Sequence, residues 1–167
     1  SIFNGKSTTP SEGEDQVDVP SRFDPATFAS HPEMDAYTVT DELLKRLENN
    51  PYGFIAVNYA NCDMVGHTGV MEAAQGAVKA VDICVKQVVD AILEMGGEAI
   101  ITADHGNADT MLDEKGEPVT KHSTSKVPLV HICKEPVPFK KNSGKLADIA
   151  PTILTLMGLE VPKGMEG

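Results

Sequence analysis

Two short segments of the chain each combine a carboxylate with an imidazole. The first pairs Asp63 with His67, four residues further on, and the second places Asp104 directly before His105. Carboxylate oxygens and imidazole nitrogens both bind divalent metals, and side chains four residues apart converge on one ion if the chain between them makes a helical turn. Either segment taken singly is also typical of a capped turn or a solvated surface, so the metal hypothesis needs independent support.

The positions of the two segments supply that support. Each follows a short apolar run that is typical of a buried strand, Gly53–Tyr59 in the first case and Ala99–Thr102 in the second. Ligands of open α/β sheets bind outside the carboxyl ends of the strands, so both segments are predicted to reach the same edge. Gly106 is predicted to bend the backbone sharply enough for Asp104 and His105 to face one centre.

A third histidine, His122, stands in a polar run before the apolar segment Val127–Cys133. With it, the candidate set holds two carboxylates, three imidazoles and no sulfur, which suits Mn²⁺, Zn²⁺ or Mg²⁺. Two such ions side by side would serve phosphoryl transfer, because they bind phosphoryl oxygens and lower the pKa of a nucleophilic hydroxyl. The nearest hydroxyls are those of residues 123–125, and the sequence does not distinguish which of them would be activated.

The other histidines and the cysteines are given no place in this set. His31 lies in an irregular region and His131 inside an apolar run, so both are interpreted as structural. Cys62, Cys84 and Cys133 are widely spaced and form no C-x-x-C pair, which predicts thiols rather than a disulfide framework or a thiolate zinc site. Cys62 adjoins the first segment and is interpreted as a small residue in a tight loop.

The elements that must position these residues alternate between strands and helices. Residues 1–34, rich in proline, glycine and serine, are predicted to be loop with one short strand. Thr38 and Asp41 resemble a capping box at the start of the first helix. The predicted helices cover residues 35–50, Val70 to Met95, and Leu146 to Met157. This alternation indicates an α/β layered sandwich with a largely parallel sheet flanked by helices.

Composition narrows the class of protein. The 167 residues are 41% apolar and 23% charged, an ordinary balance for one folded soluble unit. The net charge of −11 argues against nucleic acid or an anionic membrane as a partner, and only Arg22 and Arg46 could form guanidinium clamps on a phosphate. There is no apolar run of membrane-spanning length and no signal-peptide pattern, so we expect a cytoplasmic protein. The opening at Ser1 suggests a piece of a longer chain.

Three motifs together resemble one family. The segments 58–69, 102–109 and 121–124 are similar to those of cofactor-independent (2,3-bisphosphoglycerate-independent) phosphoglycerate mutases, and the similarity extends from residues 3–5 to residues 147–152. The resemblance implies an alkaline phosphatase-like fold. It also implies interconversion of 3-phosphoglycerate and 2-phosphoglycerate in glycolysis, through a phosphoserine intermediate, with two Mn²⁺ ions or similar metals and no organic cofactor.

The resemblance also assigns metal ligands. It implies that Asp63, His67 and His122 hold one ion, and that Asp104 and His105 hold the second. The family's nucleophilic serine, a further aspartate ligand and the inserted substrate-binding domain have no counterpart here. Residues 1–167 therefore resemble the C-terminal segment of the metal-binding domain, expected to be inactive alone. The intact enzyme is expected to be a monomer that takes a small-molecule substrate, whereas the isolated segment is expected to self-associate.

Two other functions remain open from the sequence. The same ligands would serve a metal-dependent phosphatase or hydrolase of the same superfamily. The amino-acid sequence of residues 63–69 nevertheless resembles the mutases more than the other members and favours the mutase. A non-catalytic metal-binding subunit is the alternative from a different class.

Overall fold

A computed structural model of the chain describes residues 8–49 and 52–165. These residues form two compact units, Ser1–Lys134 and Glu135–Gly167, and each unit is described by itself. Residues 3–5, where the family resemblance begins, and residue 50 of the first predicted helix lie outside the described residues.

The described part of the first unit contains three α-helices, and the two long ones were predicted from the sequence. Its α-helices are α1 (Ala36–Asn49), α2 (Asn61–Gly66) and α3 (Met71–Glu94). Thr38 lies inside α1, so the predicted capping box at the helix start is wrong. Within residues 8–34 the predicted strand is absent, and the regular element formed there is a 3-10 turn, Pro25–Thr27, whose first amides are capped by Asp24.

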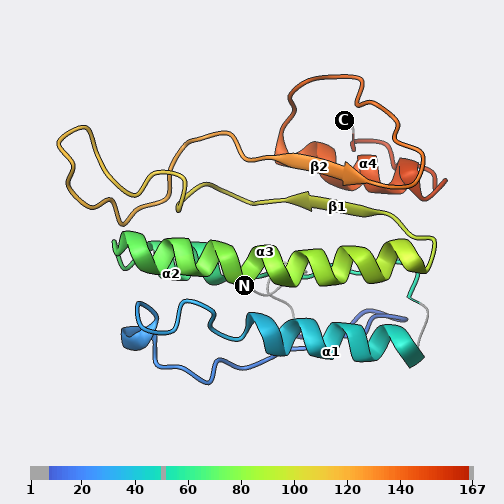
Figure 1. Cartoon of the computed structure of the whole chain (residues 1–167). Coiled ribbons are helices and arrows are strands. Elements are labelled where there is room, and N and C mark those ends of the chain that lie inside the picture. The colour runs from blue at the N-terminus through green and yellow to red at the C-terminus, as the bar shows by residue number, and fades with distance from the viewer. Residues whose placement is uncertain (1–7, 50–51, 166–167) are drawn as a thin grey trace. The chain divides into compact units, whose positions relative to one another are not determined.

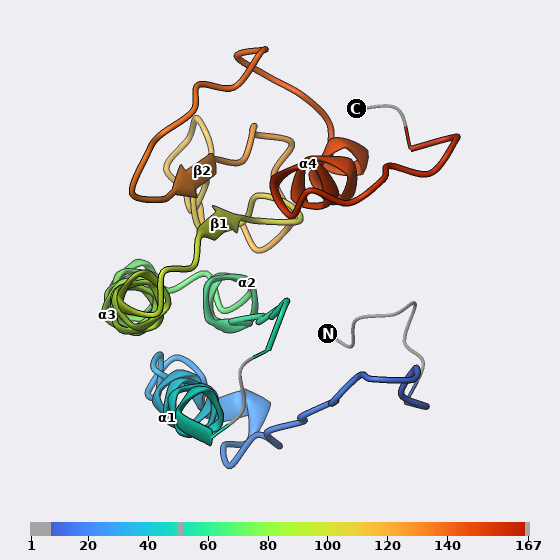
Figure 2. The same ribbon diagram turned by 90° about the vertical axis from the view of Figure 1, so that its right-hand side faces the viewer.

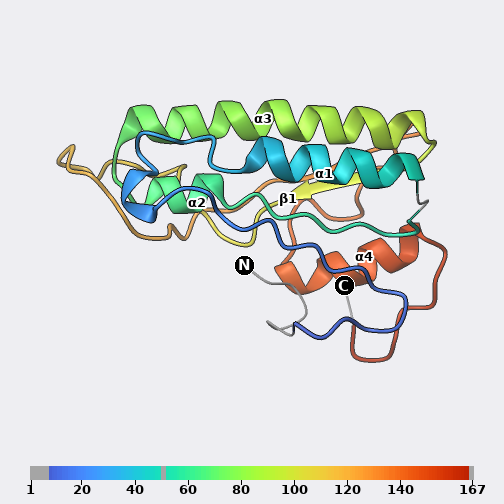
Figure 3. The same ribbon diagram turned by 90° about the horizontal axis from the view of Figure 1, so that it is seen from below.

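Small side chains bring the helices of this unit together. α3 buries the side chains of Ala73, Ala74, Ala77, Ala80 and Cys84. These residues add little bulk, so α1 and α2 both pack closely against α3. The layer formed by α2 and α3 lies between α1 on one side and the strands on the other (Figures 1 and 2). Seen from below, α1 and α3 run side by side in the same direction (Figure 3).

The two strands in the described part of the first unit are antiparallel, whereas the sequence predicted a largely parallel sheet. β1 (Ala99–Thr102) matches its predicted range, and β2 (Leu129–Ile132) is shorter than predicted. The pair is antiparallel, with Ala99 opposite Ile132 and Thr102 opposite Leu129. A parallel pair needs a long crossover connection, usually a helix, whereas residues 103–128 form loops and turns that fold back on themselves. The α/β composition is confirmed, and the largely parallel sheet stays a prediction, because the two strands among the described residues are antiparallel.

The strand predicted over Gly53–Tyr59 does not form in the described residues. Residues 52–60 belong to no ladder, and Phe54 is 57% exposed. An apolar run becomes a strand only when a neighbouring strand satisfies its backbone hydrogen bonds. The described residues provide no such neighbour at this position.

The second unit carries the last predicted helix. Its first turn, Leu146–Asp148, is a 3-10 helix, and α4 (Ile149–Leu156) continues it. Asp148 accepts a hydrogen bond of 2.9 Å from the backbone N–H of Lys145, which fixes the entry into the helix. Among the described residues, no helix combines the length and the apolar character needed to cross a membrane.

Candidate metal centre

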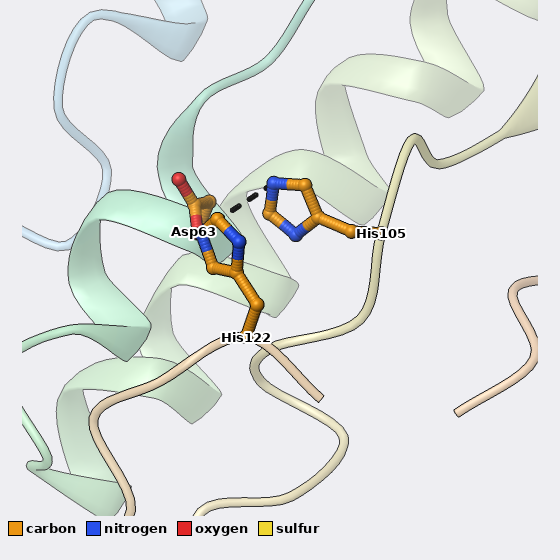
Figure 4. Close-up of side chains that lie close together, drawn as sticks. All are labelled: Asp63, His105 and His122. Atoms are coloured by element: carbon orange, nitrogen blue, oxygen red, sulfur yellow. Dashed lines mark ion pairs between the residues drawn. The ribbon is translucent and has the colours of Figure 1, made fainter. Parts of the chain in front are cut away.

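Three separate elements of the first unit contribute side chains to one cluster. Asp63 lies in α2, His105 lies in the loop after β1, and His122 lies in the loop before β2. The three side chains point toward one another, and a dashed line marks the pair of Asp63 and His105 (Figure 4). One ligand atom from each residue lies within 4.8 Å of the other two.

The Oδ1 atom of Asp63 is the point on which the imidazoles converge. It lies 3.1 Å from Nε2 of His67, 3.1 Å from Nε2 of His122 and 4.0 Å from Nε2 of His105. The rings of His105 and His122 stack with their centroids 3.7 Å apart. Four predicted site residues therefore share one centre.

A helical turn joins Asp63 to His67, as the four-residue spacing predicted. The backbone N–H of His67 donates to the carbonyl oxygen of Asp63 at 3.1 Å, so both side chains lie on one face of α2. Nδ1 of His67 lies 2.7 Å from the carbonyl oxygen of Thr120. Because a carbonyl can only accept, Nδ1 carries a proton, and Nε2 of the neutral ring is left as the atom that binds a cation.

With its proton on Nδ1, His67 shows whether the side chains around Asp63 suit a metal ion. In the neutral ring, Nε2 of His67 presents a lone pair to a carboxylate oxygen of Asp63 only 3.1 Å away. Two acceptors this close repel unless a proton or a cation lies near both of them. The donors are nitrogen and oxygen without sulfur, a set that suits Mn²⁺, Zn²⁺ or Mg²⁺. The cluster therefore fits a divalent cation.

Asn107 holds the carboxylate in place and was missed by the sequence analysis. It is 5% exposed, and its side-chain amide donates to Oδ1 of Asp63 at 2.7 Å and to the Asp63 carbonyl at 3.2 Å. A Cβ atom on Gly66 would lie 2.3 Å from Oδ1 of Asn107. A glycine is therefore required beside this amide. The sequence contained Asn107 in a turn-like segment, and no spacing rule distinguishes an amide that supports a ligand from one that caps a turn.

Gly106 has a different role from the one predicted. Its φ angle is outside the left-handed region, so a special bend is not the reason for a glycine here. A Cβ atom at this position would lie 2.1 Å from Oγ of Ser123. The backbone N–H of Ser123 donates to the carbonyl of Gly106 at 2.8 Å. The missing side chain thus allows the loop that carries His122 to lie against the loop that carries His105.

Asp109 links the loop that carries His105 to the loop that carries His122. Oγ of Ser123 lies 2.9 Å from its carboxylate. A hydrogen bond from the Ser125 hydroxyl, with smaller contributions from Ser123 and Thr110, outweighs the effect of burial and lowers the pKa of Asp109 to about 2. The carboxylate is therefore ionised at neutral pH and remains an acceptor for the residues that follow His122.

The remaining candidates lie outside the centre. Asp104 is the most exposed of the predicted ligands, with 80% of its side chain accessible, and its Oδ1 lies 3.7 Å from Nε2 of His105. His31 stacks on Phe23 at 4.5 Å between ring centroids, which agrees with a structural role. Cys62 lies in α2 rather than in a loop, and burial raises the pKa of its thiol, which makes it a poor nucleophile.

Comparisons with known proteins agree with this chemistry. The sequence model of the Metalloenzyme superfamily matches residues 1–161. The chain is 50% identical over 167 residues to a 2,3-bisphosphoglycerate-independent phosphoglycerate mutase of Clostridium botulinum, covering 99% of this chain and 32% of the relative. It is 52% identical over 166 residues to the protein of the same description from Bacteroides thetaiotaomicron, again with 99% and 32% covered.

A solved structure is also similar. It is a crystal structure of Leishmania mexicana phosphoglycerate mutase at low cobalt concentration, which matches with a TM-score of 0.78 and 33% sequence identity. The match covers 89% of this chain and 30% of that protein. The chain thus spans about a third of the length of the relatives it matches.

Proposed function

Because the chain belongs to the Metalloenzyme superfamily, we propose that it is the metal-binding part of a 2,3-bisphosphoglycerate-independent phosphoglycerate mutase. The reaction interconverts 3-phosphoglycerate and 2-phosphoglycerate through a phosphoserine intermediate. The observation that carries the proposal is the convergence of Asp63, His67 and His122 on one point. The phosphoserine step and the glycolytic context rest on the sequence resemblance alone, and the cytoplasmic location rests on the sequence pattern.

The proposed ligands come from two segments, one with Asp63 and His67 and one with Asp104 and His105, and from the separate histidine His122. Asp63, His67 and His122 hold one ion, and Asp104 and His105 hold the second. Mn²⁺ is the proposed metal, with Zn²⁺ or Mg²⁺ as alternatives that the same donors accept. When bound, the ions stabilise negative charge on the transferring phosphoryl group. His105 supports a pair of neighbouring sites, because its ring stacks on His122 while Asp104 lies beside it.

Hydrogen bonds from neighbouring residues orient the ligands of this centre. The Thr120 carbonyl keeps the proton of His67 on Nδ1, and the Asn107 amide fixes the Asp63 carboxylate. Preorganised ligands of this kind need little rearrangement when charge develops on a bound phosphoryl group.

In this proposal the chain contributes ligands but no nucleophile. The family resemblance implies that the nucleophilic serine and the groups that grip phosphoglycerate lie elsewhere in the full-length enzyme, and this chain covers only 32% of the Clostridium botulinum relative. The isolated chain is therefore expected to bind metal without interconverting phosphoglycerates. It is also expected to self-associate, which is supported by apolar side chains of α3 that are about half exposed, such as Val78 at 48% and Ile83 at 47%.

A chimera tests the proposed activity. The matching third of the Clostridium botulinum relative is replaced by this chain, and formation of 2-phosphoglycerate from 3-phosphoglycerate is followed with Mn²⁺ present. We expect activity in the chimera, a loss of at least a hundredfold in its Asp63→Ala variant, and no change in a control variant at the exposed Glu114, Glu114→Gln. A chimera that folds, binds Mn²⁺ and releases inorganic phosphate instead of 2-phosphoglycerate would contradict the mutase and support the hydrolase.

A further inference from the structure

A second group of metal-binding side chains lies on the β1–β2 ribbon, apart from the Asp63 centre. It consists of Glu98, His131 and Cys133. Glu98 directly precedes β1, His131 lies in β2, and Cys133 directly follows β2. Because the strands are antiparallel, with Ala99 opposite Ile132, the start of one strand lies beside the end of the other. The pairing therefore brings Glu98 beside His131 and Cys133, although Glu98 and His131 are 33 residues apart in the sequence.

The three side chains differ in exposure and offer different ligand atoms. Nε2 of His131 lies 2.7 Å from Oε2 of Glu98. The imidazole of His131 is 6% exposed, whereas the Glu98 side chain is 49% exposed. Cys133 is half-buried and is not in a disulfide. One ligand atom from each residue lies within 4.8 Å of the other two, so a carboxylate, an imidazole and a thiol surround one point.

We propose that Glu98, His131 and Cys133 form a zinc site with one coordination position left for water or an exogenous ligand. The combination of sulfur, nitrogen and oxygen suits Zn²⁺ and related late transition metals, while Mn²⁺ and Mg²⁺ prefer oxygen-rich sets. The site therefore differs in metal preference from the Asp63 centre, which contains no sulfur. The inference is independent of the proposed mutase activity.

The geometry requires only small movements. Ligand bonds to zinc of roughly 2.0 to 2.3 Å place tetrahedral donors about 3.3 to 3.8 Å apart. The three ligand atoms already lie within 4.8 Å of one another, and the 2.7 Å separation of His131 Nε2 and Glu98 Oε2 must widen by about an ångström to admit the ion. The half-exposed Glu98 side chain can supply this movement by rotamer changes, while the nearly buried His131 stays in place.

The competing explanation is a simple cross-strand contact between Glu98 and His131. A hydrogen bond from an Nε2–H of the imidazole to the carboxylate accounts for their 2.7 Å separation without a metal. That explanation does not involve the Cys133 thiol, whose sulfur lies within 4.8 Å of the ligand atoms of both partners. The decisive observable is therefore whether the sulfur of Cys133 binds a metal.

Cobalt substitution reports on the sulfur directly. The purified 167-residue chain is titrated with Co²⁺ under reducing conditions at a pH where histidine is neutral. Binding of a thiolate to Co²⁺ produces a sulfur-to-metal charge-transfer band in the near ultraviolet, which nitrogen and oxygen ligands do not produce. We expect the intensity of the band at saturation to correspond to one thiolate-bound Co²⁺ per chain, whatever cobalt the sulfur-free Asp63 centre also takes up, and the band to disappear when Zn²⁺ displaces the cobalt.

Matched variants assign the band. Cys133→Ser should abolish it, and Glu98→Gln, a change at a half-exposed side chain, should weaken cobalt binding at this site at least tenfold while circular dichroism stays unchanged. The control Cys62→Ser should retain the band. Retention is also expected in Asp63→Ala, which separates this site from the proposed mutase centre. Absence of the band in the folded chain, or its persistence in Cys133→Ser, would overturn the proposal.

Discussion

The side-chain amide of Asn107 donates a hydrogen bond of 2.7 Å to the same carboxylate oxygen of Asp63 that faces the imidazoles of the candidate centre. The two oxygen acceptors of residue 63 favour this orientation of the amide, because only its nitrogen can donate to them. Asn107 is nearly buried, so water competes little for this bond. We infer that Asn107 is a positioning residue for the ligand rather than a ligand itself.

Replacement of Asn107 should therefore weaken metal binding without removing a ligand. We expect Asn107→Ala to reduce Mn²⁺ affinity by about ten- to a hundredfold, the range typical of lost hydrogen bonds to metal ligands. Isothermal titration calorimetry measures the change, with circular dichroism as a check of folding. The exposed Asn49 provides a control, since Asn49→Ala lies at the end of α1 and should leave affinity unchanged. An Asn107→Ala variant with wild-type affinity would contradict the positioning role.

Gly66 should tolerate no side chain, because the amide of Asn107 occupies the space. A Cβ atom would lie 2.3 Å from its Oδ1. Alanine in a helix gains roughly 0.5 to 1 kcal/mol over glycine, whereas overpacking costs about 1 to 3 kcal/mol, so Gly66→Ala should be destabilising overall. Urea denaturation measures the free energy of unfolding. Gly53→Ala, where no atom lies within 4 Å of the added carbon, should change it little. Equal effects of the two substitutions would argue against the close contact.

The candidate ligands were predictable because local rules placed them. The spacing of Asp63 and His67 requires only one helical turn, and α2 provides it. His105 was placed by the apolar run before it, which forms β1 as predicted. These inferences depend on the sequence within a few residues of each site, where helix geometry and strand patterning act.

Features that depend on long-range pairing were not predictable. An apolar run such as Val127–Cys133 carries no information on strand direction, so the antiparallel pairing with β1 was missed. The cluster of Glu98, His131 and Cys133 follows from that pairing and was missed with it. Asn107 was missed for a similar reason, since its partner Asp63 lies 44 residues earlier.

Asn61 should stabilise the attachment of α2 to the segment that precedes α1. It is 2% exposed, and its side-chain amide donates to the carbonyl oxygens of Pro32 and Glu33 at 2.8 and 2.6 Å. Asn61→Ala leaves both carbonyls without these donors, which costs about 1 to 3 kcal/mol per unsatisfied buried group. We expect the midpoint of urea denaturation to fall accordingly. If the midpoint is unchanged, water has replaced the amide and the attachment is weaker than the distances indicate.

The ion pair of Arg22 and Asp35 should make stability depend on pH. Nε and the backbone N–H of Arg22 donate to the Asp35 carboxylate at 2.6 and 3.0 Å. Burial pushes the pKa of Asp35 upward, but the hydrogen bonds and the charge of Arg22 outweigh it and lower the pKa below its usual value. Since the folded pKa lies below the unfolded value of about 3.9, the stabilisation is present above that value and is lost as pH falls through the folded pKa.

Asp35→Asn should remove this contribution and flatten the acid side of the stability profile. We expect the variant to be less stable than the wild type at pH 7 and to approach it as the pH falls below the folded pKa of Asp35, because the wild-type carboxyl is then protonated. Urea denaturation at a series of pH values measures the convergence. The exposed Asp18 gives the matched control, in which Asp18→Asn should shift neither the stability nor its slope against pH. A difference between wild type and Asp35→Asn that stays constant down to the lowest pH would show that the carboxylate charge contributes nothing, and that lost packing or hydrogen-bond geometry accounts for the change.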